Sequence, residues 1–382
     1  MGAGKNLRTI GKQNIHNVIK LLIMEKSLSR KELSDRLGLT KMTVGNIVNH
    51  LKEEGYVTET RDTGENHTIG PKPTAITIVP KRILAVGVHI SSTKITTMLI
   101  DIVDGILIQK EESVDNLESN QQLASVIKQM VGDLLSDSND LDLYVVAIGV
   151  TFDGAVDLKT GKITVSMDRL EKEVIAIKSI LEKKFRLPTI VGNDIEGASI
   201  AELIYGANRG PVGTYYLNMG ETIRGAYITD YTILYGDTSR CGEVGHMSVK
   251  YDGPLCLCGS RGCYHLYAST ELLLKNSNSH SIDEINLKLQ DRDPLVLRTL
   301  EDFIQISSVV FSNIVHLYSP NYILVGGELA KLDYAIYKKI ERLLNERILF
   351  KRERYVKVVI SDVKTKANTM GAALIILREL FT

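Results

Sequence analysis

The sequence predicts an α/β protein in which a small N-terminal winged helix-turn-helix domain precedes two α/β lobes. Two observations carry this prediction. Within residues 1–79, stretches with helical spacing of apolar side chains are followed by two short alternating segments. From residue 80 onward, segments rich in Val, Ile and Leu alternate with amphipathic stretches. That alternation is typical of the strands and helices of an α/β fold.

The N-terminal region shows the element order of a winged helix-turn-helix. Apolar residues between Ile15 and Leu22 recur at intervals of three and four, which predicts a first helix. Ser29 and Glu32 have capping-box spacing and open a second helix, and Thr40 caps a third after the turn at 38–39. Segments 56–60 and 75–78 alternate as strands around a tip at 61–72, the predicted wing.

The third predicted helix buries Val44, Ile47 and Leu51 and turns its polar side outward. Recognition helices present their early residues to base edges and phosphates in the major groove. Residues 1–52 hold ten basic and three acidic side chains, a net of +7, although the whole chain is neutral. The alternative is a three-helix protein-interaction module with incidental basic residues. The predicted DNA contacts are Lys41, Met42, Thr43, Asn46 and Asn49.

The rest of the chain predicts two lobes. A hairpin over 83–101, a helix near 121–135, a strand at 144–150, a helix at 175–185 and a strand at 189–191 form the first. A helix at 197–205, a hairpin over 215–233, a helix-rich stretch at 269–317 and a strand at 322–325 form the second. We place the domain boundaries at 1–79, 80–195 and 196–366, with a helix over 367–382 packing on the first lobe.

Neither a membrane span nor a secretory signal is expected. No segment approaches 18 uncharged apolar residues, and the first residues lack an apolar run of the required length. We therefore expect a cytoplasmic protein, in which disulfides are disfavoured.

One short loop concentrates three of the four cysteines. His246, Cys256, Cys258 and Cys263 supply the one nitrogen and three sulfurs of a tetrahedral Zn²⁺ site, and the glycines at 253, 259 and 262 allow sharp bends. Four protein ligands leave no open position, so the zinc is predicted to be structural. The alternative is a set of ordinary buried thiols with a core histidine. Cys241 lies outside the cluster and is expected not to be a ligand.

The motifs now assembled resemble the ROK family of repressors and sugar kinases. They are a winged helix, Gly-Asn-Asp at 192–194, Gly-Glu-Val-Gly-His at 242–246 with the Cys-x-Cys-x4-Cys that follows, and Val-Gly-Gly at 325–327. More narrowly, the chain is similar to the repressors related to xylose and N-acetylglucosamine regulators. The resemblance implies a two-lobed, actin-like, ATPase-type fold around a cleft, a homodimer or tetramer, and a sugar in the cleft.

Comparison with the kinases of that family predicts that this chain is not an enzyme. Their first hairpin carries Asp-x-Gly-Gly-Thr for the nucleotide phosphates, whereas residues 89–93 here read His-Ile-Ser-Ser-Thr. Their second phosphate loop, Gly-Thr-Gly-Ile-Gly, is replaced at 220–224 by Gly-Glu-Thr-Ile-Arg. A carboxylate and two bulkier side chains thus stand where anionic phosphates would pass.

The sugar side of the site resembles the family more closely. Asp194 matches the catalytic base of the kinases, which without a nucleotide can only accept a hydrogen bond. His265 stands where many family members have Glu, and the loop at 149–154 also departs from the family, with Thr151 and Asp153 replacing Gly and Pro. Asn193 and Asp194 have a simpler alternative as a turn and helix cap, and His265 as a histidine without a ligand role. The predicted effector contacts are Asn193, Asp194, Glu243, His246 and His265.

These observations favour a homodimeric transcriptional repressor of sugar-metabolism genes, xylose among the candidates. Its winged helix would bind double-stranded operator DNA, and its zinc-stapled ROK domain would sense a sugar or sugar phosphate. Two alternatives remain at this point. One is a sugar kinase with an attached DNA-binding head, and the other is a repressor controlled by a protein partner.

Overall fold

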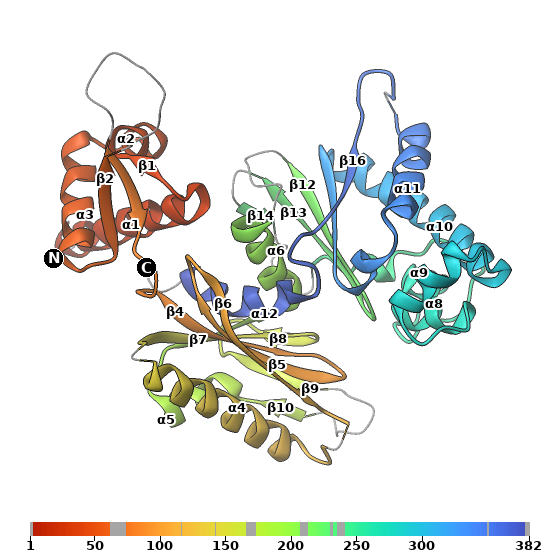
Figure 1. The fold of residues 1–382 in the computed structure, drawn as a ribbon, viewed down its shortest axis with the longest axis horizontal. Helices are drawn as coiled ribbons and strands as arrows, with labels where there is room; N and C mark the ends of the chain where they lie inside the picture. Colours follow the sequence, from red (N-terminus) through yellow and green to blue (C-terminus); the bar gives the residue numbers. More distant parts are fainter. Residues whose placement is uncertain are drawn as a thin grey trace. The chain divides into compact units, whose positions relative to one another are not determined.

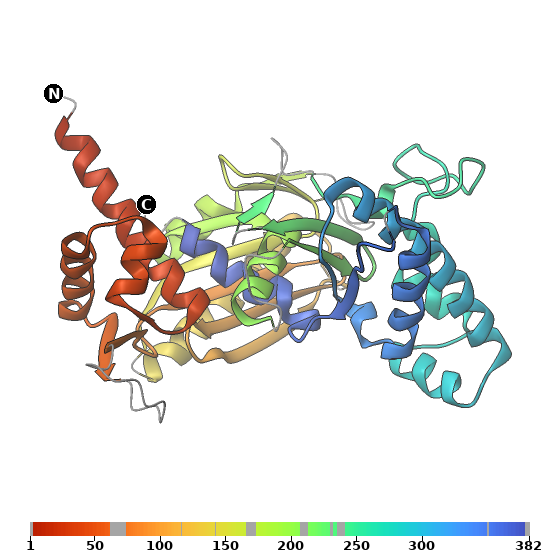
Figure 2. The same ribbon diagram turned by 90° about the horizontal axis from the view of Figure 1, so that it is seen from above.

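The computed structural model describes residues 3–61, 74–115, 117–141, 143–165, 173–206, 213–229, 232–234, 241–349 and 351–378. The chain divides into two compact units, one made of residues 1–194 and 369–382 and the other of residues 195–368. Figures 1 and 2 show the elements of both from two directions.

The N-terminal part of the first unit is a winged helix-turn-helix, as the sequence predicts. Its three-stranded sheet has the order β1-β3-β2. The predicted inner face of the third helix is buried, and the helix begins after a Thr40 cap that accepts a hydrogen bond from the Thr43 N–H. The wing tip lies outside the described residues. The elements are α1 (Ala3–Glu25), β1 (Leu28–Ser29), α2 (Arg30–Leu37), α3 (Lys41–Glu53), β2 (Val57–Arg61) and β3 (Thr74–Ile78).

The chain then forms a five-stranded sheet of order β11-β7-β4-β5-β6. Strand β4 lies in the middle of this sheet and is buried along its whole length. Burial is expected for a central strand that is rich in Val, Leu and Ile. Helices α4 and α5 lie on one face (Figure 1), and a small sheet of order β10-β9-β8 adjoins. The elements are β4 (Leu84–Ile90), β5 (Lys94–Asp101), β6 (Gly105–Ser113), α4 (Asn120–Asp140), β7 (Val145–Phe152), β8 (Ala155–Asp157), β9 (Lys162–Val165), β10 (Glu173–Ile175), α5 (Ile177–Phe185) and β11 (Thr189–Asn193).

The second unit is built on another five-stranded sheet, of order β14-β13-β12-β15-β16. Its core joins this sheet to the long helix α10 and to α11. The elements from α6 on are α6 (Asp194–Tyr205), β12 (Thr214–Met219), β13 (Ile223–Thr229), β14 (Thr232–Leu234), η1 (Val244–His246), α7 (His265–Ala268), α8 (Thr270–Asn276), α9 (Ile282–Gln290), α10 (Pro294–Tyr318), β15 (Tyr322–Gly326), η2 (Glu328–Lys331), α11 (Tyr334–Arg347), β16 (Lys357–Ile360), η3 (Lys364–Lys366), α12 (Ala367–Leu374) and η4 (Ile375–Arg378).

The two large sheets share one topology. In each, three consecutive strands run antiparallel, and two later strands add in parallel beside the first of the three. The third strand of the first meander, β6, was not among the elements that the sequence predicted. Helix α6 also begins three residues earlier than predicted, at Asp194, whose carboxylate suits the positive end of a helix dipole.

The C-terminal residues from 369 on belong to the first unit. Gly149 of β7 lies against the backbone of Ala372, so close that a Cβ there would be 1.6 Å from the Ala372 carbonyl oxygen. Any side chain at this position would therefore force the backbone of β7 or α12 to shift. None of the helices in the described part of the chain combines the length and the apolar character needed to cross a bilayer.

Glu202 on α6 is a buried carboxylate inside the second unit. The Ser361 hydroxyl donates to its Oε1, while its buried Oε2 has no hydrogen-bond partner among the described residues. Burial raises the pKa of Glu202 from 4.5 to about 7. The folded state therefore holds a proton on this group that the unfolded chain releases at a lower pH.

We expect Glu202→Gln to stabilise the protein above pH 7. Because the folded pKa is raised, the contribution of this group to stability is largest below pH 4.5 and is lost as the pH rises to about 7. The variant should gain up to about 3 kcal/mol relative to the native protein at pH 8 and nothing at pH 4.5. Thermal unfolding across this range measures the difference. Glu353→Gln, in an exposed loop, is the control, and an equal pH dependence of stability in the Glu202 variant would contradict the assignment.

Candidate functional site

The loop between η1 and α7 has an irregular backbone. Hydrogen bonds between its own backbone groups hold the loop closed. The Val249 N–H donates to the Gly262 carbonyl at 2.8 Å, and the Gly262 N–H donates to the Pro254 carbonyl at 2.9 Å. Gly262 has a φ of +64°, a region that glycine reaches without strain. Gly253 is needed for space rather than for its backbone angle, because a Cβ there would be only 2.3 Å from the Tyr267 hydroxyl.

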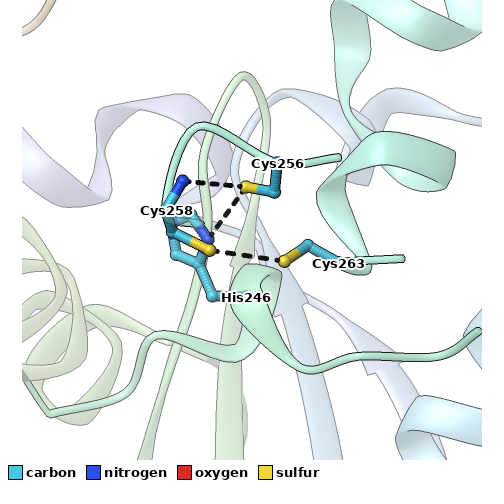
Figure 3. A group of neighbouring side chains, drawn as sticks. All are labelled: His246, Cys256, Cys258 and Cys263. Atoms are coloured by element: carbon cyan, nitrogen blue, oxygen red, sulfur yellow. Dashed lines mark hydrogen bonds between the residues drawn. The ribbon is translucent and has the colours of Figure 1, made fainter. Parts of the chain in front are cut away.

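This fold brings the four predicted metal ligands together (Figure 3). The ligand atoms of His246, Cys256, Cys258 and Cys263 all lie within 4.8 Å of one another. The Cys258 and Cys263 sulfurs are 3.6 Å apart, and the Cys256 sulfur is 3.6 Å from Nδ1 of His246. A tetrahedral ion with metal–sulfur bonds of about 2.3 Å and a metal–nitrogen bond of about 2.0 Å needs edges of roughly 3.5 to 3.8 Å. The two separations of 3.6 Å match these edges, so the four side chains could hold such an ion together.

The thiols differ in their electrostatics. The backbone N–H of Ser260 and a hydrogen bond with Cys256 lower the pKa of the exposed Cys258 to about 6. Burial raises the pKa of Cys263 to about 12. All four cysteines of the chain are free thiols, and Cys241 is outside the ligand group.

His265 lies beside the ligand group. Its Nδ1 is 3.0 Å from the Gly245 carbonyl, and its Nε2 is 3.8 Å from the Cys256 sulfur. Its ring packs edge-on against that of His246, with centroids 4.9 Å apart. A backbone carbonyl can only accept, so Nδ1 carries the proton of this hydrogen bond. His265 thus supports the orientation of His246 directly.

Glu243 immediately precedes η1 and forms an ion pair that the sequence did not suggest. Arg224 on β13 lies 3.2 Å from its Oε1, and both side chains are partly buried. Arg224 is one of the bulky residues in the 220–224 loop. The side chain that departs from the kinase pattern is therefore the one that holds the predicted sugar contact.

Asn193 and Asp194 belong to the first unit, whereas Glu243, His246 and His265 belong to the second. Asn193 ends β11 and Asp194 begins α6, and both are buried. His89, at the end of β4, is buried as well and is 3.1 Å from the Thr151 hydroxyl through its Nδ1. Burial lowers the pKa of His89 to about 4, against the opposing effect of Asp194. A neutral imidazole thus replaces the acidic residue of the kinase pattern.

The recognition helix α3 presents most of its predicted contacts to solvent. Met42 is 78% exposed, and Lys41, Asn46 and Asn49 are also exposed. Thr43 is half-buried, and its hydroxyl is 2.9 Å from that of Thr40. Its hydroxyl is therefore occupied by the helix cap, which makes it the least available of the five.

Arg30 is a residue of this region that sequence reasoning missed. Its guanidinium pairs with Glu59 on β2 at 2.7 Å and donates to the Asn49 side-chain oxygen at 2.7 Å. It also donates to the Gly45 carbonyl at 3.4 Å. The side chain of Asn49 therefore has one side fixed within the protein, and the arginine ties α3 to the wing strand. No local pattern around residue 30 indicates a bond to residue 59.

Residues 85–379 match the ROK family, which is more than three quarters of the chain. The chain belongs to the ROK family. Residues 13–58 match the winged helix-turn-helix DNA-binding domains. The motif resemblance described above and the two-part fold class are thereby confirmed.

Relatives of this ROK protein cover nearly its full length. The xylose repressor of Bacillus spizizenii is 24% identical over 380 residues, which is 97% of this chain and 96% of that protein. The DNA-binding transcriptional dual regulator NagC of Escherichia coli is 22% identical over 389 residues, or 98% and 95%.

Solved structures show the same fold. The crystal structure of a ROK family transcriptional regulator, a homologue of the Escherichia coli MLC protein, has a TM-score of 0.82 at 20% identity and covers 98% of this chain and 97% of its own. A ROK family glucokinase from Streptomyces griseus, in complex with glucose and AMPPNP, has a TM-score of 0.66 at 22% identity and covers 76% and 98%.

We expect Cys258→Ser to lower metal content and stability together. The Cys258 side chain is exposed, so the exchange removes little packing, and any loss of stability reports the lost ligand. The variant should fall from near one metal ion per chain to well below half, and its melting temperature should fall by several degrees. Elemental analysis and thermal unfolding measure both. Cys241→Ser is the matched control, and one retained ion in the Cys258 variant would refute the ligand assignment.

Proposed function

We propose that this protein is a cytoplasmic transcriptional repressor of sugar-metabolism genes, released from its operator by a sugar or sugar phosphate. The proposal rests on one observation. The same chain contains an exposed recognition helix and a ROK domain whose residues differ from the kinases at the positions of the phosphate-binding loops. Similarity to repressors over nearly the whole length of both proteins supports it.

Three segments of the chain would have different roles. Residues 1–79 would bind double-stranded DNA, and residues 80–195 with residues 367–382 would form one lobe of the sensor. Residues 196–366 would form the other lobe, together with the surface that pairs two chains. A homodimer, or a tetramer built from dimers, would match a pseudo-palindromic operator because protein and DNA would share a two-fold axis.

The ion we propose for the loop is Zn²⁺, held by His246, Cys256, Cys258 and Cys263. Three sulfurs and one nitrogen at tetrahedral spacing favour zinc over Mg²⁺ or Ca²⁺, which prefer oxygen ligands. When bound, it would supply a structural cross-link and no chemistry. His246 would then have a fixed ring orientation, reinforced by its contact with His265.

We propose that two groups of residues bind sugar hydroxyls. Asn193 and Asp194 form one group, and Glu243, His246 and His265 form the other. The pairing of Glu243 with Arg224 leaves one of its carboxylate oxygens outside the ion pair. A sugar hydroxyl donating to that oxygen would form a charge-assisted hydrogen bond, the strongest kind these residues offer.

Phosphoryl transfer fits these residues poorly. Asp194 could accept a proton from a hydroxyl, but transfer also requires a cradle for the nucleotide phosphates. His89 is buried and neutral where the kinase pattern has an acid, and Arg224 is engaged with Glu243. The fold likeness to a glucokinase keeps the kinase as the second candidate, and ATP-dependent phosphorylation of a hexose is its test.

Repression and sensing would be linked by unequal binding. An effector can release the operator only if it binds the DNA-free conformation more tightly than the DNA-bound one. By linkage, DNA would then weaken effector binding by the same factor. A ligand that bound tightly but left DNA affinity unchanged at fixed salt would contradict this mechanism.

The test of the function is fluorescence anisotropy of DNA from upstream of the protein's own gene, at one stated salt concentration. We expect specific binding that is lost in the presence of one of xylose, glucose, N-acetylglucosamine or their phosphates. Asn46→Ala should weaken specific binding by about 1–3 kcal/mol and relax sequence preference. Gln13→Ala, on α1, is the control. No specific binding by the native protein would return the kinase to first place.

Glu243→Gln tests the effector site separately. Gln keeps a neutral oxygen that still accepts the sugar hydroxyl, so only the charge-assisted part of the hydrogen bond, about 1 kcal/mol, should be lost, and release should need roughly fivefold more sugar. DNA affinity without sugar should be unchanged. The control is Glu271→Gln, on the exposed start of α8. An unaltered half-release concentration would remove Glu243 from the site.

A further inference from the structure

A cavity of about 640 Å³ opens within the second unit, and none of the predicted metal or effector residues lines it. Its walls are one face of α10, the helix α8, Lys250 in the loop between η1 and α7, and Tyr267 on α7. The volume is in the range of small-molecule sites, roughly 300–1,000 Å³.

The α10 wall consists of one helical stripe. Its residues recur at intervals of three and four, and the opposite face of the helix is buried in the core. The stripe is apolar at both ends and polar in the middle, with a cation and an anion one turn apart. Its members are Leu295, Arg298, Thr299, Asp302, Gln305 and Ile306.

Two cations of the cavity lack an acidic partner. Among the described residues, Lys250 and Arg298 are within ion-pair distance of no carboxylate, and Asp302 is paired with no basic group. The Lys250 ammonium lies 5.1 Å from the centre of the Tyr267 ring, which holds it at the rim. Arg298 precedes Asp302 by four residues on the helix. At this spacing a basic residue before an acidic one forms a weaker ion pair than the reverse order.

An ordinary solvated face is the competing explanation for these charges. Against it stand the apolar groups of the same cavity: Leu272 from α8, Leu295, which is 46% exposed, and the partly buried Ile306. A cavity with apolar walls and a few convergent polar groups is the usual form of a ligand site.

We propose that this cavity binds a small organic anion, a carboxylate or phosphate ester with an apolar body. The anionic group would bind Lys250 and Arg298 by charge-assisted hydrogen bonds. The apolar body would lie against Leu272 and Ile306. Asp302 accepts a hydroxyl or amine donor from the ligand and, as a like charge, repels a second anionic group.

The experiment measures binding of four probes to the metal-loaded full chain by calorimetry and ligand-observed NMR. Phenyl phosphate and benzoate carry the expected chemistry, benzyl alcohol is neutral, and benzylamine is cationic. We expect at least one of the two anions to bind more tightly than both other probes. Preference for phenyl phosphate identifies a phosphate ester, and preference for benzoate identifies a carboxylate.

Variants locate the binding. Lys250→Gln with Arg298→Gln should weaken anion binding about tenfold or more, since each charge-assisted hydrogen bond is worth roughly that factor. Lys275→Gln with Lys339→Gln removes the same charge from residues outside the cavity and should change nothing. Thr299→Trp fills the cavity without altering charge and should abolish binding.

Circular dichroism and metal content confirm that each variant is folded. Equal binding of benzylamine and the anions, or undiminished anion binding in the Lys250/Arg298 variant or in Thr299→Trp, overturns the proposal. The measurement uses no DNA and none of the sugars tested above. Its result is therefore independent of whether the protein is a repressor.

Discussion

The convergence of the four predicted metal ligands, His246 at the end of η1 and three cysteines in the loop that follows, is the constraint on which the rest of this part of the second unit depends. The loop has little regular secondary structure, so its shape rests on crossing backbone hydrogen bonds and on this cluster. Glu243 and His246 enter it at one end, and Tyr267 lies beyond the other. Lys250 is part of the same closure, because its carbonyl accepts a hydrogen bond from the Gly253 N–H at 3.1 Å. A disturbance of the cluster would therefore reach the predicted effector residues Glu243 and His246 and the proposed anion cavity together.

The departures from the kinase pattern are chemically consistent with one another. Replacing an acid by His89 removes a charge from a buried position, and burial keeps that imidazole neutral. Replacing a glycine by Arg224 introduces a charge, and Glu243 neutralises it at 3.2 Å. Each change thus has a local compensation that preserves the fold while altering what the surrounding space can bind. Such compensation is expected when a scaffold is retained and its chemistry is exchanged.

Sequence patterns predicted the elements whose signal is local. The capping box at Ser29 and Glu32, the buried stripe of α3 and the ligand spacing of the cysteine loop all depend on neighbours a few residues apart. The wing tip and the effector contacts remain predictions. What sequence reasoning missed is non-local: the bonds of Arg30 to Glu59, the pairing of Arg224 with Glu243, and the repeated sheet topology. These features join residues that are far apart in the sequence. The local periodicity of side chains carries no information about such contacts.

The position of Arg30 has a thermodynamic consequence for DNA recognition. Its guanidinium contacts Gly45 and Asn49 on the recognition helix and Glu59 on the wing strand, so these two elements share one fixed support. Helix and strand orientations are then set when the domain folds, before any nucleic acid arrives. Ordering them at the interface would otherwise cost conformational entropy at the moment of association. The recognition helix would then meet the double helix already oriented, and DNA whose groove geometry does not match that orientation would have to deform to be bound.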